Sequence, residues 1–123
     1  MTETFDASAA LPNASANINF ALLRAARETN PDIRFDILAR ALLELPTEIN
    51  KDQIYSALMR IGFNQLNSLE KNDDPAFRRT WIISLNLIID FIKLNATQEF
   101  KSDQRYISLK AQVKKLNMPV IPR

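Results

Sequence analysis

The hydrophobic positions of this chain recur with the period of an amphipathic helix over most of its length. In segment 15–29 the apolar residues follow one another at intervals of three and four, at Ile18, Ala21, Leu22 and Ala25. This spacing places them on one face of a helix. Segments 31–45, 51–69 and 103–116 show the same pattern. We therefore expect four amphipathic helices, the first of them capped by Ser15.

Prolines and polar residues mark where these helices begin and end. Pro31 and Pro75 stand where the fixed φ of proline suits the first position of a helix. Pro46 cannot continue the preceding helix and ends it. Asn50, followed three residues later by Gln53, has the spacing of a capping box. The boundaries thus rest on local chemistry as well as on periodicity.

Segment 75–95 differs from the others because it is apolar around most of its circumference. Its polar positions form one narrow stripe, at Arg79, Asn86, Asp90 and Lys93. A helix that is apolar nearly all round is packed by neighbours on several sides. We expect this helix to be central and the stripe to be its edge toward solvent. The alternative, a buried Asp90, would require a partner for its charge.

The chain's single glycine, Gly62, lies inside the predicted helix 51–69. Glycine costs about 1 kcal/mol relative to alanine in a helix interior. Its presence indicates a close helix crossing or a local break before Phe63. Segment 96–102 is also ambiguous, because the helix before it can continue or a loop can end at a cap on Ser102.

The pattern as a whole predicts an all-α fold. We expect a single-domain bundle of about five helices over 15–117, a flexible leader over 1–14 and an extended tail over 118–123. No alternation typical of strands and no internal repeat is present. A chain of 123 residues is long enough for one core.

The composition argues against most enzyme chemistry. The chain has no histidine, no cysteine and one glycine. Imidazole bases, thiol nucleophiles, zinc sites and glycine-rich phosphate loops are therefore excluded. Acidic residues such as Asp32 and Asp74 stand where a helix N-terminus favours negative charge. We predict that the protein is not an enzyme and holds no metal or cofactor.

The N-terminus and the longest apolar stretch bear on localisation. Residues 1–6 lack the basic start and apolar run of a secretory signal. The stretch 81–94 is interrupted by polar residues and falls short of the ~20 residues that a membrane span needs. We expect no membrane span and a cytoplasmic protein.

Charge distribution supports one candidate function, nucleic-acid binding. The chain carries a net charge of +2, but residues 101–123 hold six basic residues and one acidic residue. The candidate phosphate contacts are Lys101, Arg105, Lys110, Lys114 and Lys115. Basic residues also suit the end of a helix, and no aromatic residue is interleaved with them. We therefore keep nucleic-acid binding as the alternative function.

The favoured function is protein binding. Met118, Val120 and Ile121 stand beside two prolines in the tail, and extended apolar segments of this kind dock in grooves. Phe63 and Phe100 lie off the main apolar stripes, and they would either widen such a surface or fill the core between the helices. The protein would then be an adaptor, assembly factor, inhibitor or regulatory subunit of another protein. The sequence leaves open whether the tail docks on that partner or covers the bundle's end, and it does not indicate an oligomeric state.

Overall fold

A computed structural model describes residues 7–47 and 49–117 of the chain. These residues form six helices and no strand, which confirms the all-α prediction with one helix more than expected. The helices are α1 (Ala7–Arg27), α2 (Pro31–Leu43), α3 (Lys51–Lys71), α4 (Pro75–Asn95), α5 (Gln98–Lys101) and α6 (Gln104–Asn117).

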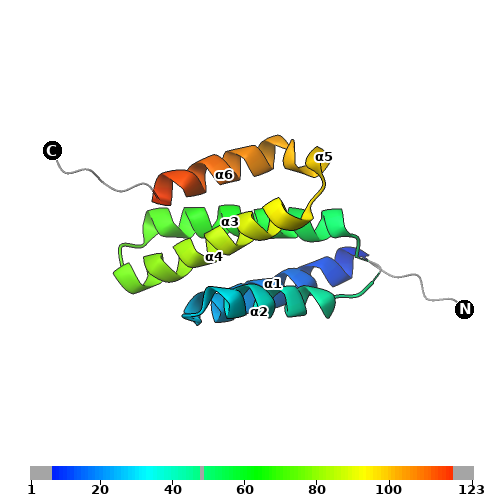
Figure 1. The fold of residues 1–123 in the computed structure, drawn as a ribbon, viewed down its shortest axis with the longest axis horizontal. Coiled ribbons are helices and arrows are strands. Elements are labelled where there is room, and N and C mark those ends of the chain that lie inside the picture. The colour runs from blue at the N-terminus through cyan, green and yellow to red at the C-terminus, as the bar shows by residue number, and fades with distance from the viewer. Residues whose placement is uncertain (1–6, 48, 118–123) are drawn as a thin grey trace, which may run out of the picture.

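Successive long helices run in opposite directions and lie in three tiers (Figure 1). Helices α1 and α2 pair along one side of the molecule, α3 and α4 lie in the middle, and α6 lies on the other side. Helix α4 packs against α1, α2, α3 and α6. The predicted central position of segment 75–95 is therefore confirmed.

The core gathers around α4. Leu85, Ile88 and Ile92 of α4 are completely buried. Each of the surrounding long helices contributes a fully buried leucine, at Leu22, Leu38, Leu58 and Leu109. These residues belong to the apolar faces that the helical period predicts, so periodicity and packing agree.

Local capping fixes the helix starts as the sequence predicts. The Asn50 side chain accepts a hydrogen bond from the Gln53 backbone N–H at 2.8 Å, and the Gln53 side chain accepts one from the Asn50 N–H at 2.9 Å. This is the predicted capping box. Pro31 and Pro75 occupy the first positions of α2 and α4.

Two predicted boundaries are wrong. Helix α1 begins at Ala7, so Ser15 lies inside it and does not cap it, and residues 7–14 belong to the helix. Alanine, with the highest helix propensity, is frequent there, and it supports a helix without a periodic pattern. Helix α2 ends at Leu43, two residues early. Residues 1–6 of the predicted leader lie outside the described residues.

The ambiguous segment 96–102 holds the extra helix. Thr97 caps the one-turn α5 by accepting a hydrogen bond from the Phe100 N–H at 3.2 Å. Ser102 does not cap α6, since its hydroxyl donates to the Gln98 carbonyl at 3.0 Å. Asp103 takes that role, and its carboxylate accepts from the Arg105 N–H at 2.8 Å.

Within residues 7–47 and 49–117, none of the helices combines the length and the apolar character needed to cross a membrane. The predicted absence of a span therefore holds for this part of the chain.

Candidate protein-binding groove

An open groove separates α2 from α4. Helix α2 packs along α1 and touches α4 less closely, which leaves a hollow of about 680 Å³ between them. Its walls are Phe35 and Arg34 of α2 and Ile83, Leu87 and Leu94 of α4. The exposed area of this lining is mainly apolar, and the charged side chains of Asp32, Asp90 and Lys93 also line the hollow.

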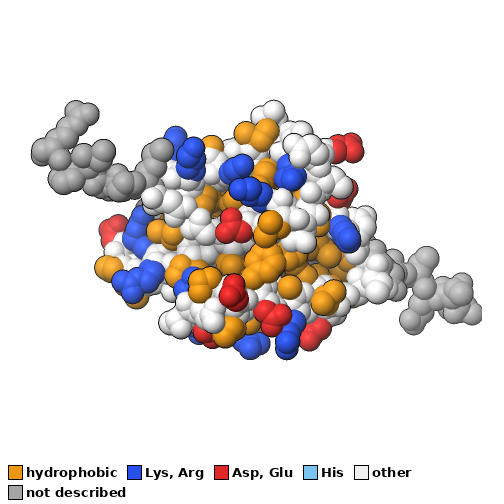
Figure 2. Space-filling view, viewed as in Figure 1, with side chains coloured by type: hydrophobic (Ala, Val, Ile, Leu, Met, Phe, Trp, Pro, Cys, Tyr) orange, Lys and Arg blue, Asp and Glu red, His pale blue; other side chains and the backbone are white. Residues whose placement is uncertain are grey.

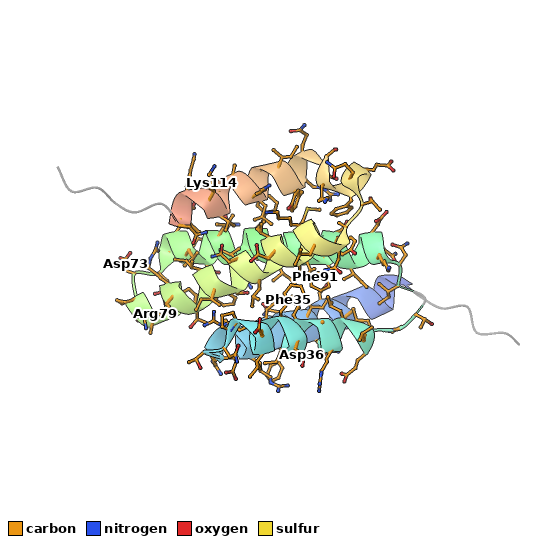
Figure 3. The ribbon with its side chains drawn as sticks, in the orientation of Figure 1. Phe35, Asp36, Asp73, Arg79, Phe91 and Lys114 are labelled. Carbon is orange, nitrogen blue, oxygen red and sulfur yellow. The ribbon has the colours of Figure 1, made fainter. Side chains whose placement is uncertain are left out.

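A row of aromatic rings begins at Phe35, which lines the groove. The rings of Phe35 and Phe91 lie 5.6 Å apart between centroids, and Figure 3 shows the two side chains meeting between α2 and α4. Phe91 lies 6.5 Å from Tyr55, whose ring is 5.2 Å from that of Phe100. The half-buried rings of Phe35 and Phe91 therefore belong to a row of four packed rings that continues through Tyr55 to Phe100. We call the Phe35 and Phe91 rings the aromatic floor.

A second hollow extends the groove toward the start of α3. It measures about 320 Å³, shares Phe35 with the first, and is lined mainly by apolar residues of α2, α3 and α4. We call the two hollows together the α2–α4 channel. Leu43, in the second hollow, is 84% exposed, and Leu94, in the first, is 71% exposed. They are the most exposed large hydrophobic residues of the described chain.

The channel appears as an apolar patch on one face of the molecule. In Figure 2, hydrophobic side chains gather at the centre of this face, between α2 and α4, with polar and charged side chains around them. Apolar patches with polar rims mark interaction sites on protein surfaces. The arrangement suits contact with an apolar surface.

A basic groove lies on the other side of α4. It separates α4 from α6 and measures about 430 Å³. Four lysines line it, and we call them the lysine edge: Lys93, Lys101, Lys110 and Lys114. Three of them are among the residues predicted to contact phosphates, and Lys93 also lines the α2–α4 channel.

The other two predicted phosphate contacts do not join the lysine edge. Arg105 is paired with Asp103 at 3.0 Å. This hydrogen-bonded pair lowers the pKa of the Asp103 carboxyl and raises that of the Arg105 guanidinium. Lys115 is exposed but does not line the groove.

The polar stripe of α4 forms the ridge between the channel and the lysine edge. Asp90 is exposed, so the interpretation of the stripe as a solvent edge is confirmed and burial of Asp90 is wrong. Asn86 and Asn117 hydrogen-bond to each other through their amides, at 3.1 and 2.8 Å. This pair fixes the end of α6 against α4.

The structure does not bring the predicted protein-binding residues together. Phe63 and Phe100 are half-buried against the core, and neither lines the α2–α4 channel. Met118, Val120 and Ile121 lie outside the described residues. Their roles in binding stay predictions.

Sequence reasoning missed the two exposed leucines of the channel. Leu94 belongs to the helix predicted to be packed by neighbours on several sides, and Leu43 lies on the predicted amphipathic helix 31–45. One signal was present in the lengths of the helices. A helix that is apolar nearly all round needs neighbours along its whole length, but α2 has 13 residues and α4 has 21, so α2 cannot cover all of α4. Incomplete cover leaves part of α4 open.

The described residues contain no group of three or more acidic side chains placed to hold a metal ion. A scan against protein-family models and searches of curated proteins and of solved structures found no match.

Proposed function

We propose that this protein is a non-enzymatic binding protein that holds an apolar segment of another protein in its α2–α4 channel. Its role would be that of an adaptor, assembly factor, inhibitor or regulatory subunit. The observation that carries the proposal is the exposure of Leu43 and Leu94 beside an aromatic floor. A partner that covers them removes this apolar surface from water.

Burial of the two exposed leucines contributes to the free energy of association. Complete burial of a leucine side chain contributes about 1.5–3 kcal/mol. Leu43 and Leu94 have most of that gain still available, since most of each side chain is exposed. The phenylalanine floor is already held by neighbouring rings, so little side-chain freedom is lost there on binding.

An affinity pull-down from the native cell, with and without nuclease, tests this function. We expect a protein partner that survives nuclease and is lost when Leu43→Gln and Leu94→Gln are combined. Glutamine keeps helix propensity, and both positions are exposed, so the fold should persist. Phe20→Gln is the matched control, because Phe20 is 65% exposed but lies on α1, outside the channel. Equal recovery by the double variant would contradict the proposal.

A further inference from the structure

We infer that the occupant of the α2–α4 channel is an amphipathic helix of the partner, with acidic residues along the flank that faces α6. This inference rests on the proposed function and names the class of partner that the channel accepts. Two observations carry it: the helical walls of the channel and the unbalanced charge on one side of it.

The walls favour a helical occupant over an extended one. Both walls are helices, and the backbone N–H and C=O groups of a helix form hydrogen bonds within that helix. The described residues also include no strand to whose edge a peptide strand could be added. An extended peptide would find no backbone partners in the channel, whereas a helix satisfies its own. Helix α2 has 13 residues, which corresponds to a wall of about 20 Å. That length accepts apolar anchors at positions i, i+3, i+4 and i+7.

The lysine edge determines the charge of the occupant. The described residues form two ion pairs, Asp36–Arg40 and Asp103–Arg105. Neither pair includes one of the four lysines of the lysine edge. The two hollows on either side of the α4 ridge are lined by five basic side chains, which are these four lysines and Arg34. Asp32 and Asp90 are the acidic side chains of the same lining, so five positive and two negative charges leave +3. Figure 2 shows basic side chains over α6, next to the apolar patch.

The dimensions bring the two features into contact with one helix. A helix with its side chains is about 10–12 Å across, close to the spacing of packed helices. A helix in the channel therefore packs against the α4 ridge with one flank. Glutamates or aspartates on that flank would lie near Lys93, which lines both grooves, and near the lysines behind it.

The apolar features favour a peptide over nucleic acid. The Phe35 and Phe91 rings pack against each other and are not free to stack with bases. A nucleic acid on the lysines would also leave Leu43 and Leu94 exposed. An acidic amphipathic helix uses the lysines and the leucines together.

The test is a display library of helix-forming peptides with randomised surface positions, panned against the full chain. We expect enriched peptides to combine an apolar stripe with Asp or Glu on one flank. A labelled synthetic peptide of that sequence should bind about tenfold more weakly to Lys110→Gln/Lys114→Gln at low salt, from the loss of two exposed ion pairs. Lys71→Gln/Lys115→Gln, which removes the same charge outside the lysine edge, should bind it as the unaltered chain does.

The outcomes separate this inference from the proposed function. Enriched peptides that need Leu43 and Leu94 but show no acidic preference would overturn the inference alone. Failure to enrich any peptide, or peptides that bind Leu43→Gln/Leu94→Gln equally well, would overturn both. A dimer that dissociates in that variant would identify a second copy as the occupant and overturn the inference. A DNA oligonucleotide that displaces the peptide, and that binds Leu43→Gln/Leu94→Gln as tightly as it binds the unaltered chain, would also overturn the inference.

Discussion

Gly62 of α3 lies so close to Leu109 of α6 that a β-carbon at position 62 would stand 2.9 Å from Leu109 Cδ2. Non-bonded carbons normally approach to about 3.5–4.0 Å. Leu109 is completely buried, so its side chain has little room to move. Of the two interpretations of Gly62, the close helix crossing is confirmed. The local break is wrong, because α3 is continuous across this position.

We expect Gly62→Val to lower the free energy of unfolding by about 2 kcal/mol, because it overpacks this crossing. Gly62→Ala should cost less, since alanine gains about 1 kcal/mol of helix propensity. Chemical denaturation of both variants measures these costs. The control is the Leu109→Ala background, in which the cost of Gly62→Val should shrink. A cost unchanged in that background would show that the crossing is not the cause.

The central role of α4 gives a second prediction. Leu85→Ala or Ile88→Ala should cost about 2–5 kcal/mol, because each removes a large, fully buried side chain from the core. Leu94→Ala, on the same helix but 71% exposed, should leave stability within about 0.5 kcal/mol. Thermal and urea denaturation test both statements. Equal costs at the three positions would contradict the described exposure of Leu94.

Sequence reasoning succeeded where the signal is local. The capping box joins Asn50 to Gln53, and proline marks the starts of α2 and α4, so these boundaries depend only on neighbouring residues. The apolar period also identified the core faces. The caps and the apolar faces both depend on residues within one helix, so they do not require knowledge of how the helices pack.

The channel could not be predicted in the same way. Ile88 and Leu94 are both apolar residues of α4, yet the first is fully buried and the second mostly exposed. The difference arises because α2 packs along α1 and leaves part of α4 uncovered. Which neighbour a helix prefers depends on packing between distant segments, and the period of one helix carries no information about it. The position of α6 could not be predicted for the same reason. That position brings Lys101, Lys110 and Lys114, three of the predicted phosphate contacts, to the same groove as Lys93.

A third prediction concerns the Tyr106 hydroxyl, which is buried and has no hydrogen-bond partner among the described residues. A buried polar group without a partner costs about 1–3 kcal/mol. Tyr106→Phe should therefore keep or raise the stability at pH 7. Urea denaturation measures this effect, and a loss above about 1 kcal/mol would show that the hydroxyl has a partner.

The same residue predicts a loss of stability in alkali. Burial, followed by the negative charge of Asp90, raises the pKa of Tyr106 above its usual value of 10.0. As the pH rises above about 10, the unfolded tyrosine loses its proton while the native one keeps it, which favours unfolding. Tyr106→Phe should make this decline less steep. The pKa of Tyr55 is also raised by burial, so part of the decline should remain.

The alternative function, nucleic-acid binding, gives a fourth prediction. We expect DNA and RNA probes to bind weakly at low salt through the lysine edge, and to dissociate at about 150 mM salt, where exposed charges are screened. Changing Lys110 and Lys114 to glutamine should reduce the salt dependence. Fluorescence anisotropy of a labelled duplex and a labelled single strand measures both. Tight binding that persists at physiological salt would favour the alternative over the proposed function.

The last prediction concerns the tail, residues 118–123, which lie outside the described residues. We expect its deletion to leave the melting temperature nearly unchanged, because the Asn86–Asn117 hydrogen bonds hold the end of α6 without it. We also expect weaker complex formation, because Pro119 and Pro122 leave Met118, Val120 and Ile121 little conformational freedom to lose on docking. Thermal denaturation and the pull-down measure the two effects. If the bundle covers these residues instead, deletion should cost about 1 kcal/mol or more from lost apolar burial. Lower stability with unchanged partner binding would refute docking of the tail on a partner.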